Sequence, residues 1–255
     1  MNDPLPDDAF VGEERLAYPA SRRRFQPGER LEFDQGYRLA HLPLVAPGHP
    51  LAIASAPGQD YQDGTYPEWR QALVVPVDWP ALAASPAFQA LEREMAAGPF
   101  AAKIAWNLGR RRRHVLHATL ASGLAAAAVP VHAAALTAAM AALGPLRFRL
   151  GGPLVGNRNF GRIYLPAYPR QVGGDDAFAR LQDAVGARRS GFYGVGLYHL
   201  TDPLDAHETA ALADLLDRWQ DRVVAELELD RVVIHATRDD LVLSGRNLAE
   251  IRAKK

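Results

Sequence analysis

The chain has 255 residues and no cysteine, and its 29 basic and 29 acidic side chains give a formal net charge of zero. The lack of cysteine excludes disulfides, thiolate chemistry and cysteine-based zinc sites. Zero net charge provides no global field that attracts nucleic acid, so any basic footprint must be local. With 48% hydrophobic and 23% charged residues, the composition is typical of a soluble globular protein of one large domain or two closely packed lobes.

Residues 1–69 form an N-terminal extension of unclear role. The first 30 residues are rich in Pro, Asp and Arg and predict an irregular arm, and short apolar runs over 37–55 predict short strands. The acidic start has no apolar core segment, so we expect no signal peptide and a cytoplasmic location. The alanine-rich run 121–142 is broken by Ser, Gly, Pro and His, so we expect no membrane contact.

Residues 70–150 predict strands and helices in alternation. Ser85 as N-cap and Pro86 at the first helical position predict a helix over 86–97, which Gly98 ends. A second helix, over 130–143, begins at Pro130. Strands are predicted over 71–79, 100–106, 114–120 and 145–152, with an arginine run, 110–113, in the loop before the third.

Residues 161–245 continue the alternation. The segment 161–168 is expected to be the hairpin partner of 145–152, and a glycine-rich strand is predicted over 191–201. Asp205 and Glu208 fit a capping box at the start of a helix. The predicted elements, in chain order, are a strand over 161–168, a helix over 175–185, a strand over 191–201, a helix after Asp205, a hairpin of 229–237 with 240–245, and a charged tail over 246–255.

The frequent hairpins favour an α+β fold with antiparallel sheets, and the two halves of 70–245 resemble rough copies of each other. Each half contains a His-x-Thr pattern on a predicted strand, at His117 to Thr119 and at His199 to Thr201. Residues i and i+2 of a strand point to the same face, so an imidazole and a hydroxyl stand side by side. The same spacing recurs at 207–209, in a predicted helix, and at 235–237.

The segments HVLHATL (114–120) and YHLT (198–201) resemble the two-histidine (2H) phosphoesterase superfamily, which includes RNA 2',3'-cyclic phosphodiesterases and 2'-5' RNA ligases. The resemblance covers roughly 70–245. It implies a bilobal, pseudo-symmetric fold in which two antiparallel sheets face a central cleft with helices outside. It also implies His117 and His199 as catalytic residues and Thr119 and Thr201 as phosphate ligands. Asp202 departs from the family pattern, which continues with an apolar residue there.

His235 and Thr237 are the alternative second motif. We favour His199 because it lies about 80 residues after His117 and is followed by a helix and a closing hairpin, as in the family. In that interpretation the segment around His235 closes the second lobe. The prediction is that His117 and His199 face each other across the cleft, about 5–8 Å apart.

Other side chains could contact the substrate. Arginines on the predicted hairpin and beside the first motif could bind phosphate, and tyrosines beside the second motif could stack on a base, although solvent-facing or core roles remain open. These candidates are Arg113, Arg147, Arg149, Arg162, Tyr193 and Tyr198.

The resemblance implies a metal-independent phosphodiesterase with no cofactor, and we expect it to act as a monomer. Its substrate would be an RNA end, a nucleotide or a small cyclic phosphate, with a 2',3'-cyclic or 2'-5' phosphodiester. Two imidazoles with ordinary pKa values near 6.5 can act as base and acid at neutral pH. A non-catalytic nucleotide- or RNA-binding module on the same fold is the alternative. A zinc enzyme is less favoured, because no His-x-x-x-His helix is present.

Overall fold

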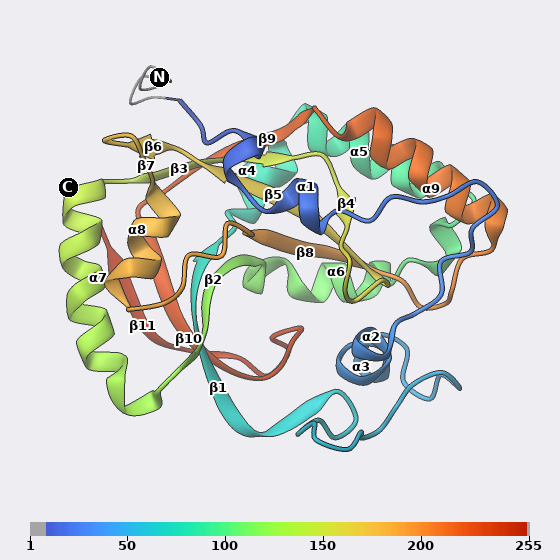
Figure 1. Ribbon diagram of the computed structural model, residues 1–255, viewed down its shortest axis with the longest axis horizontal. Coiled ribbons are helices and arrows are strands. Elements are labelled where there is room, and N and C mark those ends of the chain that lie inside the picture. The colour runs from blue at the N-terminus through green and yellow to red at the C-terminus, as the bar shows by residue number, and fades with distance from the viewer. Residues whose placement is uncertain (1–8, 254–255) are drawn as a thin grey trace.

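Strands from both halves of the chain form one curled antiparallel sheet, shaped as a half-barrel, in a computed structural model that describes residues 9–253 (Figure 1). The order along the sheet is β11-β10-β1-β2-β8-β5-β3-β9, and β4 pairs with β5. The strands are β1 (Thr65–Pro76), β2 (His117–Leu124), β3 (Leu146–Gly151), β4 (Leu154–Val155), β5 (Arg162–Pro169), β8 (Gly194–His199), β9 (Val223–Leu229), β10 (Arg231–Asp239) and β11 (Arg246–Arg252). A separate two-stranded ribbon pairs β6 (Gln171–Val172) with β7 (Asp175–Asp176).

The fold is therefore α+β, as the sequence predicts. The two separate facing sheets are not confirmed, because β2 pairs with β8 and joins the halves into one sheet. Only one register position, Ala118 opposite Val195, is recorded for this join. The expected hairpin is confirmed by the antiparallel pairing of β3 with β5.

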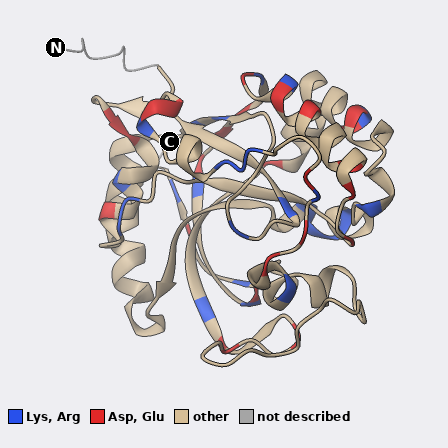
Figure 2. Cartoon of the chain, turned by 45° about the vertical axis from the view of Figure 1, so that its right-hand side comes forward, with Lys and Arg blue, Asp and Glu red and all other residues tan. Residues whose placement is uncertain are grey.

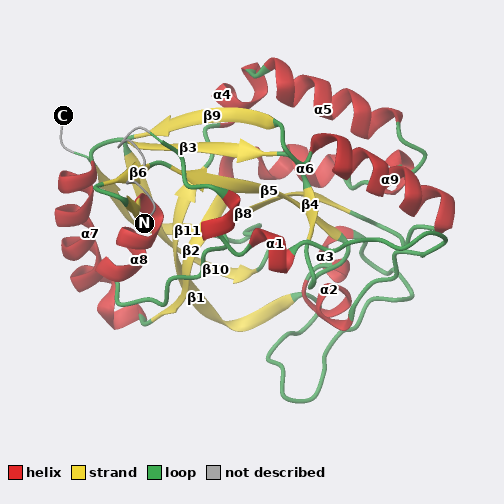
Figure 3. Ribbon diagram, turned by 45° about the horizontal axis from the view of Figure 1, so that its top comes forward, coloured by secondary structure: helices red, strands yellow, loops and turns green. Residues whose placement is uncertain are grey.

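Helices lie around the strands (Figure 3). They are α1 (Tyr18–Ser21), α2 (Gln35–Ala40), α3 (Leu42–Val45), α4 (Trp79–Ala84), α5 (Pro86–Ala97), α6 (Trp106–Arg112), α7 (Val129–Leu143), α8 (Ala177–Ala184) and α9 (Ala206–Trp219). Short 3-10 turns occur at Glu13–Arg15, Ala101–Lys103, Arg113–Val115 and Ala126–Ala128. Basic and acidic positions are interspersed along the helices at the right of Figure 2, in keeping with the zero net charge.

Two helices begin where the sequence predicts. The Ser85 hydroxyl accepts a hydrogen bond from the Phe88 amide at the start of α5. The predicted capping box of α9 is present, since the Asp205 carboxylate accepts from the Glu208 amide and the Glu208 carboxylate from the Asp205 amide. Each cap satisfies amides that would otherwise have no partner within the helix.

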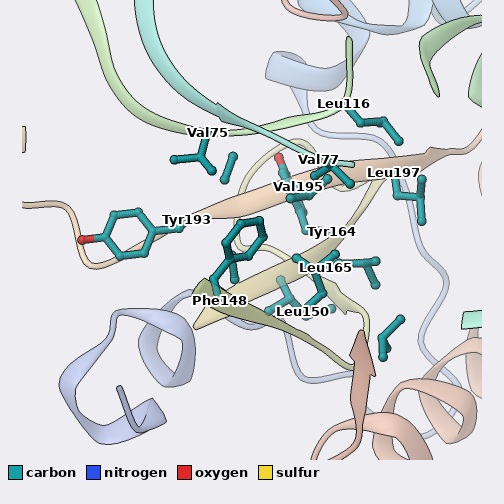
Figure 4. Packing of buried hydrophobic residues seen from close by; sticks show 14 of the residues in the cluster. Val75, Val77, Leu116, Phe148, Leu150, Tyr164, Leu165, Tyr193, Val195 and Leu197 are labelled. Carbon is teal, nitrogen blue, oxygen red and sulfur yellow. The ribbon is translucent and has the colours of Figure 1, made fainter. Parts of the chain in front are cut away.

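The main core lies on the face of the sheet opposite the candidate site. Figure 4 shows Val75 and Val77, from β1 and the residue after it, near Val195 and Leu197 of β8, with Phe148 of β3 beyond. All five side chains are buried. Because β1 and β8 come from different halves of the chain, this shared core fixes the two halves relative to each other.

Five predictions of local structure are wrong. The segment 100–106 is not a strand but a 3-10 turn leading into α6, so most of the arginine run is helical rather than a loop. In a short apolar run, periodicity alone cannot distinguish a strand from a helix. The segment 37–55 contains helices α2 and α3 instead of strands, and 246–252, expected as a charged tail, forms β11, while 240–245 is the preceding loop. The last two residues, 254–255, and the first eight lie outside the described residues.

The described part of the N-terminal extension packs onto the sheet and belongs to the core. Its side chains Tyr18 and Tyr37 are fully buried. The Tyr18 hydroxyl donates to the Ala167 carbonyl, and the Tyr37 hydroxyl donates to the Leu200 carbonyl. The extension therefore covers the end of β8 where the second predicted motif lies.

Helix α7 and the turn before it form a longer apolar helical window than the breaks in the alanine-rich run indicated. The window Ala126–Leu143 is long and apolar enough to cross a membrane by length and composition, with 17% of it buried. Its buried side chains are Leu136, Met140 and Leu143. Core helices of soluble proteins meet the same criterion, so the feature by itself assigns no membrane role.

Candidate active site

One face of the sheet, made by β10, β1 and β2, carries a groove lined by alternate residues. On β1, Ala72 and Val74 point to this face, while Leu73 and Val75, which alternate with them, belong to the main core. On β10 the alternation places His235 and Thr237 on the groove face, and on β2 it places His117 and Thr119 there. Two His-x-Thr motifs therefore flank β1 and face the same space.

The imidazoles of His117 and His235 are in contact. Their ring centroids lie 5.0 Å apart with the planes 84° to each other. On β1, His117 is opposite Pro76 and His235 is opposite Ala72. On a flat sheet such positions would be roughly 16 Å apart, at about 4.8 Å per strand and 3.3 Å per residue. The curl of the sheet brings the two side chains together on its concave side.

His117 has a defined tautomer. Its Nδ1 lies 2.7 Å from the Val115 carbonyl oxygen, which can only accept, so Nδ1 carries the proton and Nε2 has a free lone pair. Burial, the neighbouring His235 and the cations Arg112 and Arg162 lower the pKa of His117 to about 3, against the opposing effect of the Val115 carbonyl. His117 is therefore a neutral imidazole at pH 7, able to take a proton at Nε2.

His235 is 5% exposed, and burial lowers its pKa to about 4. It is thus also neutral at pH 7 in the free protein. An anion bound in the groove against the two rings would raise both pKa values, because a nearby negative charge favours the protonated imidazole. The site can therefore acquire one proton when a phosphate binds.

The two threonines differ in what they can offer a ligand. The Thr237 hydroxyl donates to the Asp239 carbonyl at 2.8 Å and so is engaged in the turn after its own motif. No hydrogen bond of the Thr119 hydroxyl is recorded within residues 9–253, and Thr119 lines the groove. Thr119 is the hydroxyl free to donate to a phosphate oxygen.

The loop between β10 and β11 lies against the groove. Asp239 organises it: its carboxylate accepts from the amides of Leu241, Leu243 and Ser244 and from the Ser244 hydroxyl. Val242 lines the groove on both sides of the histidine pair and has a φ of 57°. A β-branched residue in the left-handed region is strained, so the Asp239 network must hold this conformation.

The structure does not place His199 beside His117, and the predicted facing pair is corrected to His117 with His235. His199 is 1% exposed at the end of β8, where its ring stacks on His41 of the N-terminal extension at 5.9 Å. Thr201 lies beyond the strand, with its hydroxyl near the Lys103 carbonyl and the Asp202 carboxylate. Helix α2 of the N-terminal extension covers the end of β8 and keeps His199 away from the groove. The motif pattern of the family does not include this segment, so the sequence comparison could not predict the covering.

Asp202, the departure from the family pattern, contacts the same extension. Its carboxylate lies 3.2 Å from His49 Nε2. Two residues later, Leu204 exchanges backbone hydrogen bonds with Leu31. The residues after the second motif therefore serve as a docking edge for the N-terminal segment. These contacts do not test the catalytic roles predicted for His199 and Thr201, which stay predictions.

Arg112 and Arg162 form a cationic cluster close to both His199 and His117. Arg112 is 1% exposed and donates to the carbonyls of Leu241 and Gly196. Arg162 lies over Gly196, where a Cβ would overlap its guanidinium, and its Nη1 is 3.4 Å from His41 Nε2. Burial and the two arginines, with His41, hold the pKa of His199 well below its usual value.

Most of the other predicted substrate contacts have structural roles. Arg147 and Arg149 pair with Glu226 on β9, and Arg113 stacks over the Trp79 ring at 4.7 Å. The two tyrosines are buried: Tyr193 donates to Asp176 in the core, and Tyr198 donates to Glu92. Arg162, the remaining candidate, belongs to the cationic cluster. Within residues 9–253, no group of three or more His, Asp or Glu side chains is arranged to hold a metal ion.

Sequence reasoning ranked His235 and Thr237 second to His199 and Thr201, and it missed Arg112 and Arg70 as groove or near-groove residues. The pattern IHAT was visible, and the alternation Val233, His235, Thr237 would have put both motif residues on one face. The missing information was the strand order, which places β10 two strands from β2.

Comparisons with known proteins add little to this geometry. No family model matches the sequence, and no curated protein matches it. Among solved structures, the chain is similar to the crystal structure of TT0787 of Thermus thermophilus, with 14% identity and a TM-score of 0.38. That similarity covers 72% of this chain and 97% of the other.

Proposed function

We propose that the protein is a metal-independent phosphodiesterase that cleaves a 2',3'-cyclic or 2'-5' phosphodiester of RNA or a nucleotide. The observation that carries the proposal is the contact of two imidazoles, His117 and His235, in one groove, with the Thr119 hydroxyl beside them. The resemblance of HVLHATL to the 2H phosphoesterases supports the same chemistry for the first motif.

The proposed mechanism uses one imidazole as base and the other as acid. A neutral His117 takes a proton at Nε2 from the attacking water as the oxygen–phosphorus bond forms. His235, protonated once the phosphate anion is bound, gives its proton to the leaving oxygen as that phosphorus–oxygen bond breaks. The products of a cyclic substrate are a phosphomonoester and a free hydroxyl. General acid–base catalysis of this kind contributes about 100- to 10,000-fold per group.

The Thr119 hydroxyl would donate to a nonbridging oxygen, and the nearby cations would stabilise the negative charge that grows on the phosphate. The Thr119 hydroxyl is a free donor, whereas Arg112 and Arg162 act through the field that they place on His117. Groups fixed before the reaction stabilise a transition-state anion without reorganisation.

The test is turnover of 2',3'-cyclic AMP by the purified protein in EDTA, followed by chromatography. The proposal predicts a linear product, and a fall of at least about 100-fold in His117→Gln. Thr137→Val, on the exposed side of α7, is the matched control and should keep full turnover. Activity that chelation abolishes and zinc or manganese restores would contradict it.

A nucleotide-binding module without turnover is the second candidate. It is favoured by the low pKa of both histidines, since the free protein then holds no protonated acid at pH 7. Binding of a cyclic nucleotide with no product after long incubation would support this alternative over catalysis.

A further inference from the structure

A cavity of about 220 Å³ lies between the N-terminal extension and helix α9, and it shares no lining residue with the histidine groove. The extension supplies one wall with the segment 22–26, and the C-terminal end of α9 supplies another with Asp217 and Gln220. Pro153 and Leu154, at the start of β4, complete the lining between them. At roughly 30 Å³ per water, the space would hold about seven waters or one small metabolite.

The arginine-bearing wall has a fixed backbone. Arg22 forms a β-bridge with Gly156, and the Arg23 amide donates to the Val155 carbonyl at 2.8 Å. The segment therefore runs along the chain at β4 as a short extra strand. Its side chains are presented to the cavity from a defined position rather than from a loose loop.

Two of the three arginines are already paired. Arg22 pairs with Glu13, and Arg23 pairs with Glu29 and lies over the Phe160 ring at 4.0 Å. Their charges are thus balanced, but the Nε atom of each is buried without a hydrogen-bond partner. A buried donor without a partner is costly, so both side chains favour an acceptor that enters the cavity they line.

Two unpaired charges of opposite sign remain, one on each wall. Arg24 and Asp217 line the cavity and are exposed, and neither has an ion pair or a side-chain hydrogen bond within residues 9–253. Asp217 lies in the last turn of α9, where the carbonyls of the helix end add to the negative potential. The extension wall is therefore positive and the helix wall negative.

This arrangement fits a ligand that carries both charges. The two oxygens of a carboxylate can accept from Arg24 and from the unsatisfied donors beside it, and an ammonium group can donate to Asp217. A simple anion such as phosphate would leave the Asp217 carboxylate unpaired and would be repelled by it. Phe25 and Leu216 add apolar surface to the lining, which suits an aliphatic group.

We propose that this cavity binds a free α-amino acid with an aliphatic side chain, its carboxylate toward Arg24 and its ammonium toward Asp217. The ligand joins the extension to α9, so its binding stabilises the folded protein by mass action. The site is separate from the groove and does not depend on the proposed phosphodiesterase activity.

The test is isothermal titration calorimetry of the full chain with matched probes. L-Leucine carries both charges, isocaproate is the same molecule without the amine, and isoamylamine is the same molecule without the carboxylate. We expect L-leucine to bind with a dissociation constant of about 1 mM or below, and each of the other two to bind at least about tenfold more weakly. Inorganic phosphate is the fourth probe and should not compete.

Variants assign the two ends of the ligand. Arg24→Gln and Asp217→Asn should each weaken L-leucine at least about tenfold. Asp217→Asn should not weaken isocaproate, and Arg24→Gln should not weaken isoamylamine, because each probe lacks the group that the substituted residue binds. Asp214→Asn and Arg188→Gln, exposed and outside the cavity, are the matched controls and should bind L-leucine as the wild type does.

The outcomes that overturn the proposal are distinct from those that bear on catalysis. No binding of L-leucine up to about 10 mM, or equal affinity for L-leucine and isocaproate, would overturn it. So would phosphate binding that depends on Arg24 in the absence of L-leucine binding, which would identify a simple anion site. All four variants should keep their turnover of 2',3'-cyclic AMP, since none of these residues lines the groove.

Discussion

The burial of His235 in the groove should make the unfolding free energy of the protein depend on pH. The pKa of His235 is lowered to about 4 by burial, from an ordinary value near 6.5. Between these pH values the unfolded chain binds a proton that the native protein does not. The stability contributed by the neutral ring is therefore present above about pH 6.5 and is lost as the pH falls toward 4.

The magnitude follows from those two pKa values. Between pH 7.5 and pH 5.0 the difference in proton binding amounts to about 2 kcal/mol of unfolding free energy. Solvent screens this contribution little, because His235 is only 5% exposed. His235→Gln removes this contribution. It also removes one of the causes that lower the pKa of His117, so that pKa should rise.

Urea unfolding of the wild type and His235→Gln at both pH values is the assay. The loss of stability on acidification should be about 2 kcal/mol smaller in the variant than in the wild type. An NMR titration of the imidazole protons should place the midpoint of His235 near 4. Equal losses in the two proteins, or a midpoint near 6.5, would refute the argument that this ring is held desolvated beside His117.

Other substitutions test the packing and the polar groups. Gly152→Ala places a Cβ that overlaps a backbone carbonyl of α9, so it should cost about 1–3 kcal/mol or more of unfolding free energy, whereas Gly109→Ala meets nothing within 4 Å and should not destabilise; equal melting temperatures would contradict this. Thr119→Val should lower turnover about 10- to 100-fold with little change in stability, since its hydroxyl has only the ligand to bind. Thr237→Val should instead lower stability by about 1–3 kcal/mol, because its hydroxyl supports the turn after β10; the reverse pattern would show that the two hydroxyls have exchanged roles.

Much of the fold follows from local signals in the sequence. Ser85 and Pro86 set the start of α5, and Asp205 with Glu208 sets the start of α9, because both caps are satisfied by residues within one turn. Alternation predicted β3 and its hairpin partner β5 for the same reason. These elements depend on contacts between near neighbours, which the sequence displays directly.

The candidate site depended on long-range pairing that no local pattern carries. His235 comes 118 positions after His117 in the chain and reaches it because β10 and β2 both pair with β1. His199 has the same local pattern, yet the extension covers it, and His41, between α2 and α3, stacks on its ring. Arg112 was hidden in a run of four arginines, and only the position of α6 shows that this one is buried.

Turnover of three single variants tests the central claim most directly. His117→Gln, His235→Gln and His199→Gln would be compared on the best substrate, with the folded fraction of each fixed by urea unfolding. His117→Gln and His235→Gln should each lower turnover at least about 100-fold, and the variant that carries both substitutions should lose little more. The turnover of His199→Gln should stay within about fivefold of the wild type. A loss in His199→Gln equal to that in His117→Gln, with His235→Gln fully active, would contradict it.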